Sequence, residues 1–144
     1  MDKELRRAVE HELKNLAGYR ARLEQLKLDL IDRGATPVIA IRANFPSDPT
    51  GTRVSNELDI KERMEILEIR IKRIEIAVDS LIKPEYDLIE LRYLMGVGYN
   101  NSEVMDKLGV SPRNYYYIRN RAFEKIVSIV GEDRIMMWQF ERPV

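Results

Sequence analysis

Apolar residues recur at alternating steps of three and four along two long segments of the N-terminal half. The first segment carries Val9, Leu16, Tyr19, Leu23, Leu26 and Leu30, with Glu12 breaking the register and Leu13 beside it. The second carries Ile60, Met64, Leu67, Ile71, Ile74, Val78 and Leu81 without a break. A sustained spacing of about 3.5 residues makes the narrow apolar seam that a coiled coil buries. The pattern predicts an antiparallel pair of helices over about 3–32 and 57–82.

The second of these helices is apolar beyond its seam. Ile66, Ile69 and Ile76 add apolar surface elsewhere around it. One partner helix cannot cover all of that surface, so we expect the second helix to pack also on another subunit or on the C-terminal part. Residues 1–83 are therefore predicted to form an oligomerisation module, and the protein a dimer or higher homo-oligomer.

The connection between the helices, residues 33–56, contains residues that exclude a continuous helix. These are Gly34, Pro37, Pro46, Pro49 and Gly51. Within it the run PVIAIRANF is compatible with a short extended strand, and its apolar Val38–Ile41 stretch favours docking. A helix–helix connection of this length is either functional or poorly ordered, and both readings stay open.

Signals for three further helices follow Pro84. Pro84 opens an apolar-periodic stretch (Tyr86, Ile89, Tyr93, Leu94), which ends at Gly96 and Gly98. Asn100 is a predicted N-cap with Glu103 three residues on, and the short helix after it stops at Gly109. Ser111 is a second predicted N-cap, and Pro112 suits the first position of the next helix.

Residues 84–131 are accordingly predicted to form a helix-turn-helix DNA-binding domain, and residues 132–144 a C-terminal tail. A short helix, a glycine turn and a capped longer helix present a recognition helix to the major groove. Helical spacing puts Tyr115, Ile118, Ala122 and Ile126 on the buried face of that last helix. Tyr116 and Tyr117 then point outward beside arginines, where each is either a base contact or a cover for a neighbouring helix. The fold class is all-α.

The run LIKPEYDLIELRYLMGVGYNNSEVMDKLGVSPRNYYYIRNRAFEKI resembles region 4 of the sigma-70 family, with its LRY-type motif, LG[VI]S end and following Arg-Ala pair. The likeness covers roughly a third of the chain. Pro112 and three consecutive tyrosines depart from the sigma pattern, and no segment corresponds to the sigma region that binds the −10 element. The segment PSDPTGTRVSNELDIKERMEILEIRIKRIEIAVDSL follows an N-terminal helical part and precedes the sigma-region-4-like end. In this order and in length, the whole chain resembles the RinA/ArpU group of phage regulators, which implies a phage or prophage activator of late genes.

The DNA-binding residues follow from the predicted recognition helix and from this likeness. Base and phosphate contacts are assigned to Arg113, Asn114, Tyr116, Tyr117, Asn120 and Arg121. Contacts to the DNA backbone on either side of the base contacts are assigned to Asn100, Asn101 and Arg119.

Charge and composition narrow the function classes. The 24 basic and 24 acidic residues leave no global positive field, but Ser111 to Arg121 holds three arginines and no acid, as a phosphate-contacting surface requires. There is no cysteine, and His11–Glu12 does not extend to an HExxH motif because position 15 is Asn. No nucleophile–base pair or phosphate loop is present. We therefore expect no enzyme, no cofactor and no metal site.

The first residues are too charged for a signal peptide, and no segment is long and apolar enough to span a bilayer. A cytoplasmic protein of a bacterial host cell, without membrane association, is expected. Double-stranded DNA is the expected partner, and host RNA polymerase a possible second one. A transcriptional activator is the preferred function; the alternatives are a phage terminase small subunit or a sigma-like protein that binds RNA polymerase.

Overall fold

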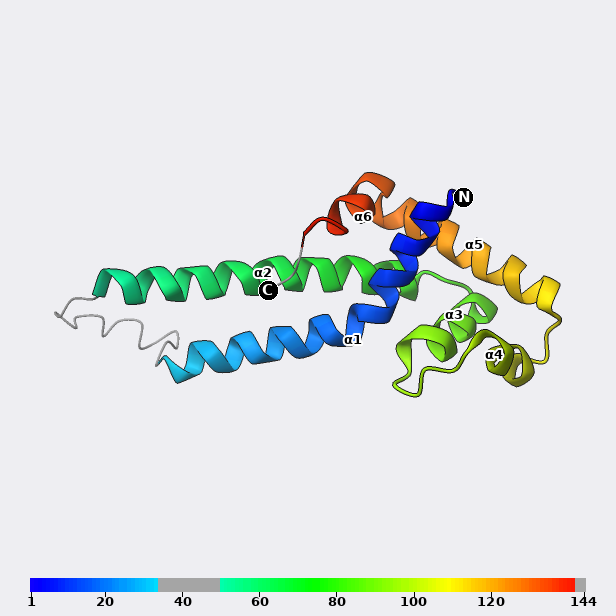
Figure 1. The fold of residues 1–144 in the computed structure, drawn as a ribbon, viewed down its shortest axis with the longest axis horizontal. Helices are drawn as coiled ribbons and strands as arrows, with labels where there is room; N and C mark the ends of the chain where they lie inside the picture. Colours follow the sequence, from blue (N-terminus) through cyan, green and yellow to red (C-terminus); the bar gives the residue numbers. More distant parts are fainter. Residues whose placement is uncertain (34–49, 142–144) are drawn as a thin grey trace. The chain divides into compact units, whose positions relative to one another are not determined.

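The computed structural model describes residues 1–33 and 50–141, with side chains from residue 56 onward in the second range, and every regular element in them is helical. The predicted all-α class is confirmed at this level (Figure 1). The elements are α1 (Lys3–Asp32), α2 (Thr50–Asp79), α3 (Lys83–Ile89), the π-helical turn η2 (Glu90–Leu94), α4 (Asn101–Leu108), α5 (Pro112–Val130) and α6 (Glu132–Trp138). No helix in the described part of the chain is both long and apolar enough to cross a membrane.

The chain divides into two compact units, one of residues 1–17 and 71–142 (unit 1) and one centred on residues 18–70 (unit 2). Residues 1–17 thus group with the C-terminal helices, which the apolar periodicity did not predict. The sequence-based division into an oligomerisation module (1–83), a DNA-binding domain (84–131) and a tail (132–144) stays a prediction. The same holds for the finer arrangement of a coiled-coil pair followed by a helix-turn-helix domain.

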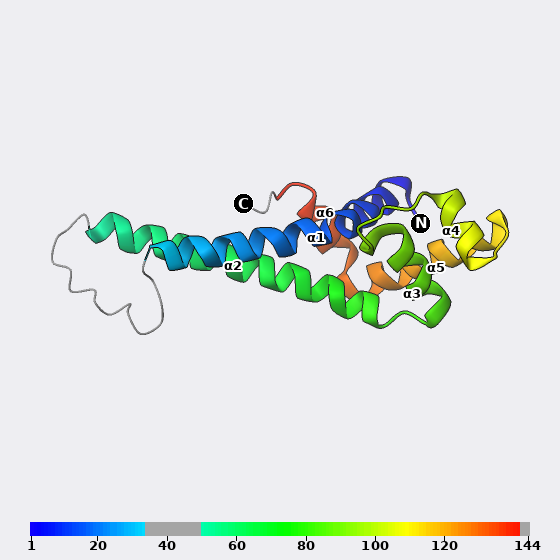
Figure 2. The ribbon, with the colours of Figure 1, turned by 90° about the horizontal axis from the view of Figure 1, so that it is seen from below.

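In unit 2, residues 18–32 of α1 and the part of α2 up to residue 70 run alongside each other in opposite directions (Figures 1 and 2). Their buried apolar residues are Tyr19, Leu26, Ile60 and Leu67. The buried guanidinium of Arg70 lies 4.6 Å above the centroid of the Tyr19 ring. A cation over an aromatic face keeps favourable electrostatics in a place where water is excluded.

The start of α2 differs from the prediction. The helix begins at Thr50, seven residues before the predicted start near 57. Gly51 falls within its first turn, and a single glycine costs a helix only about 1 kcal/mol, which does not stop it. The rest of the predicted connection, including the PVIAIRANF run, lies outside the described residues.

In unit 1, the N-terminal half of α1 contributes one side of a shared core. Its buried apolar residues are Leu5, Ala8, Val9, Leu13 and Leu16. Glu12, the residue that breaks the seam, is also buried, and its Oε2 accepts a hydrogen bond from Nε2 of Gln139 at 3.1 Å. The break in the periodicity is therefore a polar contact with the segment after α6, since a buried carboxylate needs a donor.

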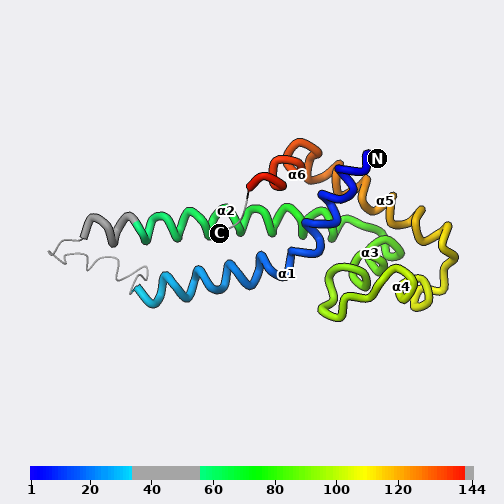
Figure 3. Tube along the Cα trace, viewed as in Figure 1, coloured from blue at the N-terminus to red at the C-terminus, as the bar shows by residue number. Residues whose placement is uncertain are grey.

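The end of α2 and the C-terminal helices supply the rest of this core, and the path of the C-terminal helices can be followed in Figure 3. α5 packs against both α3 and α6. The buried apolar residues of these helices are Leu88, Ile89, Tyr93, Val104, Tyr115, Ala122, Phe123, Ile126, Val130, Ile135 and Trp138. The segment predicted as a tail thus forms α6 and buries Ile135 and Trp138 within the unit.

A buried carboxylate fastens α3 to α5. The chain leaves α2 at Asp79, turns through an extended Ile82 and begins α3 with Pro84 in the first turn, as predicted. Glu85 accepts from the Ile82 backbone amide at 3.3 Å and from Nζ of Lys125 at 2.8 and 3.0 Å. The carboxylate therefore caps its own helix and holds the neighbouring one.

Candidate nucleic-acid interface

Local contacts define both ends of α4. The Asn100 side chain accepts from the Glu103 amide at 2.8 Å, and the Asn100 amide donates to Glu103 Oε1 at 3.0 Å. α4 ends at Gly109, whose φ of 65° is left-handed. A left-handed backbone favours glycine, because a side chain there meets its own carbonyl oxygen. The predicted capping box and glycine stop are both confirmed.

The first turn of α5 is also capped as predicted. Ser111 Oγ accepts from the amide of Asn114 at 3.2 Å, and Pro112 occupies the first helical position. The cap satisfies one of the amides that a helix start leaves without an intrahelical partner. The start of α5 is therefore fixed by local contacts, because Ser111 and its partner Asn114 are only three residues apart.

The buried face of α5 is rotated from the predicted one. Tyr115, Ala122 and Ile126 are buried as predicted, but Ile118 is only half-buried, and Phe123 and Val130 join the core instead. At 100° per residue, this set centres the packed face close to residue 119. Ile118 then lies at its margin.

Arg119 consequently belongs to the packed side of α5 rather than to the exposed side. Its guanidinium carbon lies 4.9 Å from the Tyr116 ring centroid and 5.5 Å from that of Phe123. Its Nε is buried without a hydrogen-bond partner among the described residues. Stacking between two rings is a packing role, which leaves less of this side chain for the phosphate contact predicted for it.

The opposite face of α5 collects the predicted recognition residues. Those that are exposed on it are Arg113, Asn114, Tyr117, Asn120 and Arg121, while Tyr116 is exposed at the margin of the packed face. Glu124 is exposed on the same face, one turn after Asn120. Because a carboxylate repels phosphate, the part of this face that suits a nucleic acid ends before Glu124.

The two outward tyrosines differ in their surroundings. Tyr116 is 39% exposed, packs edge-on against Tyr115 at a centroid distance of 5.0 Å and lies under Arg119. Tyr117 is 61% exposed, and Arg121 Nη1 approaches its hydroxyl at 3.5 Å. Tyr116 thus makes packing contacts within the domain, whereas Tyr117 and Arg121 form an exposed pair one helical turn apart.

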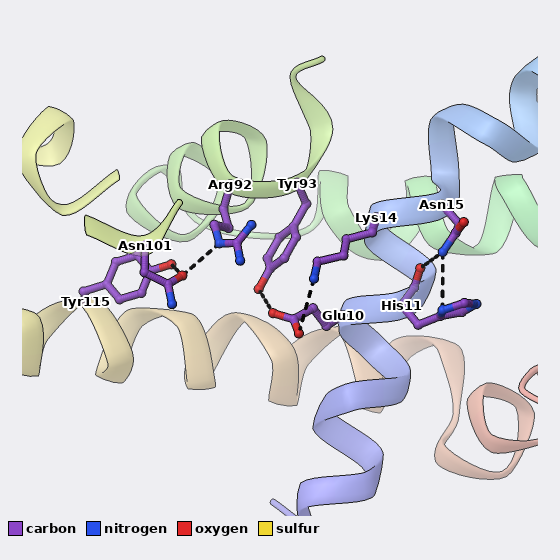
Figure 4. Close-up of polar contacts among 8 residues, drawn as sticks. All are labelled: Glu10, His11, Lys14, Asn15, Arg92, Tyr93, Asn101 and Tyr115. Carbon is purple, nitrogen blue, oxygen red and sulfur yellow. Dashed lines mark hydrogen bonds and ion pairs between the residues drawn. The ribbon is translucent and has the colours of Figure 1, made fainter. Parts of the chain in front are cut away.

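At the start of α4, Asn101 joins three elements (Figure 4). Its Oδ1 accepts from Nε of Arg92 at 2.8 Å and from the hydroxyl of Tyr115 at 2.5 Å. With both donors on the oxygen, the amide nitrogen of Asn101 is turned away from them. Arg92 was not predicted as a functional residue. The only sequence signal was its place in the LRY-type motif.

Tyr115 and Tyr93 act as hydrogen-bond donors in this part of the molecule. Burial raises the pKa of Tyr115, while the charges of Arg92 and Arg119 partly oppose the shift. Burial also raises the pKa of Tyr93, and so does its hydrogen bond to Oε2 of Glu10 at 2.7 Å. Both hydroxyls are therefore protonated at neutral pH and hold η2 and α5 through donated bonds (Figure 4).

Comparison of the chain with protein-family models, with curated proteins and with the solved structures gave no match. The likeness to sigma-70 region 4 and to the RinA/ArpU group stays a prediction. The geometry of α4 and α5 is the structural basis for a proposed function.

Proposed function

We propose that this protein is a sequence-specific DNA-binding regulator of transcription, and that α3 to α5 form a helix-turn-helix domain with α5 as the recognition helix. One observation carries the proposal. A left-handed glycine turn and a serine cap lead into a helix with one face packed in the core and the other lined by arginine, asparagine and tyrosine. Such a helix can enter a major groove.

The charges on α5 favour this role. Arg113 lies in the first turn, where the N-terminal end of a recognition helix reaches base edges, and arginine bonds to guanine through two donors. Arg121 lies about two turns further along, beside Tyr117, and suits a phosphate. The absence of acids from Ser111 to Arg121 lets a polyanion approach this face without repulsion.

The remaining exposed groups suit contacts to bases and to phosphates. The Tyr117 ring can pack on a thymine methyl, and its hydroxyl can bond a phosphate. Asn114 and Asn120 offer paired donors and acceptors for base edges. The outward amide nitrogen of Asn101 suits a phosphate at the flank, because its oxygen is already occupied by two donors.

The biological setting of the proposal rests on the family likeness and on the apolar faces of the N-terminal helices. The regulator acts as a homo-oligomer on double-stranded DNA and activates late genes of a phage or prophage. A dimer would bind two half-sites related by its own symmetry.

Selection of bound sites from a random pool of duplex DNA tests the proposal directly. We expect enrichment of one motif, and Arg113→Ala should lower affinity for it by about 1–3 kcal/mol while leaving binding to unrelated DNA nearly unchanged. Arg121→Ala should weaken binding to all sequences alike and reduce the salt dependence by about one unit of slope. Tyr117→Phe then separates hydroxyl bonding from ring packing.

Arg7→Ala is the matched control, since it removes the same charge from an exposed arginine on α1. If Arg113→Ala and Arg121→Ala bind every DNA as the unchanged protein does, α5 does not face DNA. The hypothesis of a protein that binds RNA polymerase would then take first place.

A further inference from the structure

α2 is apolar on two opposite faces. One face is buried and includes Ile60, Leu67, Ile71, Ile74 and Val78. The other is exposed: Leu58, Ile66, Ile69 and Ile76 keep 60%, 51%, 49% and 51% of their surface accessible. Because α2 is one helix from Thr50 to Asp79, its register follows from 100° per residue, which places these four within a sector of about 80°. We call them the outer face of α2.

A repeated apolar face of this kind is unlike the scattered single apolar residues of an ordinary surface. An amphipathic helix in a folded unit needs only one apolar side, and its other side is normally polar. The four residues of the outer face recur on one side of the helix, and none of them is buried by the described residues. A second molecule that covered this face would remove its apolar surface from water.

Within about 40° of the outer face, charges are segregated by sign, and Lys61 and Asp79 lie about 60° from it. Glu62 and Glu65 lie in its first half, and Lys72 and Arg73 in its second half. Glu62, Glu65 and Lys72 are exposed, and Arg73 is half-buried. A helix with acids toward one end and bases toward the other is complementary to a copy of itself running in the opposite direction.

We propose that the outer face of α2 is the contact between two copies of this chain, with the two α2 helices antiparallel about a two-fold axis near residues 67 and 68. This arrangement sets Leu58 against Ile76 of the second copy, and brings Ile66 and Ile69 together at the centre. It also pairs Glu62 with Arg73 and Glu65 with Lys72. By the same rotation, Glu62 and Arg73 lie within the sector of the outer face, and Glu65 and Lys72 lie at one edge of it. The members of each pair therefore occupy matching positions around the helix, since a two-fold axis relates each side of the contact to itself.

A parallel pair would instead place each acid beside its own copy and each base beside its own copy. Like charges facing each other at the edge of an apolar seam oppose association, so the sequence of this face selects the antiparallel orientation. The inference rests on the oligomer within the proposed function. It does not depend on DNA binding.

Charge reversal in the full chain tests the contact by sedimentation equilibrium without DNA. The unchanged protein should dimerise, and Glu62→Arg with Glu65→Lys should weaken the dimer by at least about tenfold. Adding Arg73→Glu and Lys72→Glu should restore it, because all pairs are then opposite again. Circular dichroism of each variant shows whether the helices are retained.

Cross-linking tests the orientation, since the protein has no cysteine of its own. With a short bis-maleimide, Ile69→Cys should link to itself. Leu58→Cys should not, because its two copies would lie about 28 Å apart along the axis. A mixture of Leu58→Cys and Ile76→Cys chains should link to each other.

Three results would overturn the inference: a monomeric unchanged protein, an oligomer that ignores the reversal of Glu62 and Glu65, or efficient linking of Leu58→Cys to itself. In each case the DNA selection with Arg113→Ala still reports separately on α5. A failure of the α2 contact is thereby distinguished from a failure of the DNA-binding proposal.

Discussion

Tyr93 shows how a single polar group joins segments that are distant in the chain. Its ring is buried next to Phe123, at a centroid distance of 6.0 Å, while its hydroxyl reaches Glu10 on α1, 83 positions away in sequence. Asn101 does the same on a smaller scale for η2 and α5. Each of these groups would cost free energy if buried without its partner, so each specifies one packing of the helices.

The raised pKa of Tyr93 predicts a loss of stability at alkaline pH. The unfolded chain releases the tyrosine proton near pH 10, and the folded chain only at higher pH. The contribution of the Tyr93 hydroxyl to the free energy of unfolding is therefore complete below pH 10 and is lost as pH rises above 10. Tyr93→Phe should lower the free energy of unfolding by about 1–2 kcal/mol at pH 7, and this difference should shrink above pH 10.

Urea titrations at pH 7, 9 and 10.5 measure this difference. Tyr117→Phe is the control at pH 7, because its exposed hydroxyl should leave the free energy of unfolding unchanged. A difference for Tyr93→Phe that stays constant up to pH 10.5 would show that the hydroxyl does not carry the effect.

At the scale of elements, α3 and α5 are held together by an ion pair with one buried member. The Glu85 side chain is 4% exposed and Lys125 34%, at a distance of 2.8 Å. Lys125→Met keeps the apolar stem and removes the ammonium, which leaves the carboxylate with the Ile82 amide as its remaining donor. We expect a cost of about 1–3 kcal/mol in a thermal or urea melt.

Lys83→Met provides the matched comparison. Lys83 pairs with Asp87 at 3.2 Å, but its side chain is 86% exposed. Water and salt screen such a pair, so the loss should stay below about 0.5 kcal/mol. Equal costs for the two lysines would mean that burial of Glu85 adds nothing to the contact.

The elements that could be predicted from the sequence are those with local causes. Asn100, Gly109 and Ser111 act on backbone within four residues, so the bounds of α4 and the start of α5 follow from short motifs. Glu12 and Glu85 could not be predicted as buried. Their partners Gln139 and Lys125 lie 127 and 40 positions away, and no local sequence pattern indicates these contacts.

The candidate interface also contains residues whose positions could be predicted from local patterns and one, Arg119, whose position could not. The outward positions of Arg113, Tyr117 and Arg121 follow from helical spacing after a recognised cap. The packed position of Arg119 depends on Phe123 joining the core, which the periodicity of Tyr115, Ala122 and Ile126 did not reveal. A rotation of less than one residue in the buried face was enough to move Ile118 to its margin and Arg119 to its packed side.

At the scale of the whole molecule, the N-terminal half of α1 is a structural part of the unit that carries the candidate interface. Glu10 and Glu12 bond to Tyr93 and Gln139, and apolar residues between and around them are buried. A fragment that starts at residue 84 lacks this segment as well as the end of α2. Substitutions in the full chain therefore test the domain organisation better than truncation does.

Leu13 and Leu28 offer a matched test on one helix, because Leu13 is 1% exposed and Leu28 53%. Leu13→Ala removes buried methyl groups and leaves a cavity, which should cost about 2–5 kcal/mol. Leu28→Ala should change the free energy of unfolding by less than about 0.5 kcal/mol. The fluorescence of Trp138 follows unfolding of this unit, since Trp138 is the single tryptophan and is buried in α6. Should its transition be the same in Leu13→Ala as in the unchanged protein, residues 1–17 would not belong to the core that supports α5.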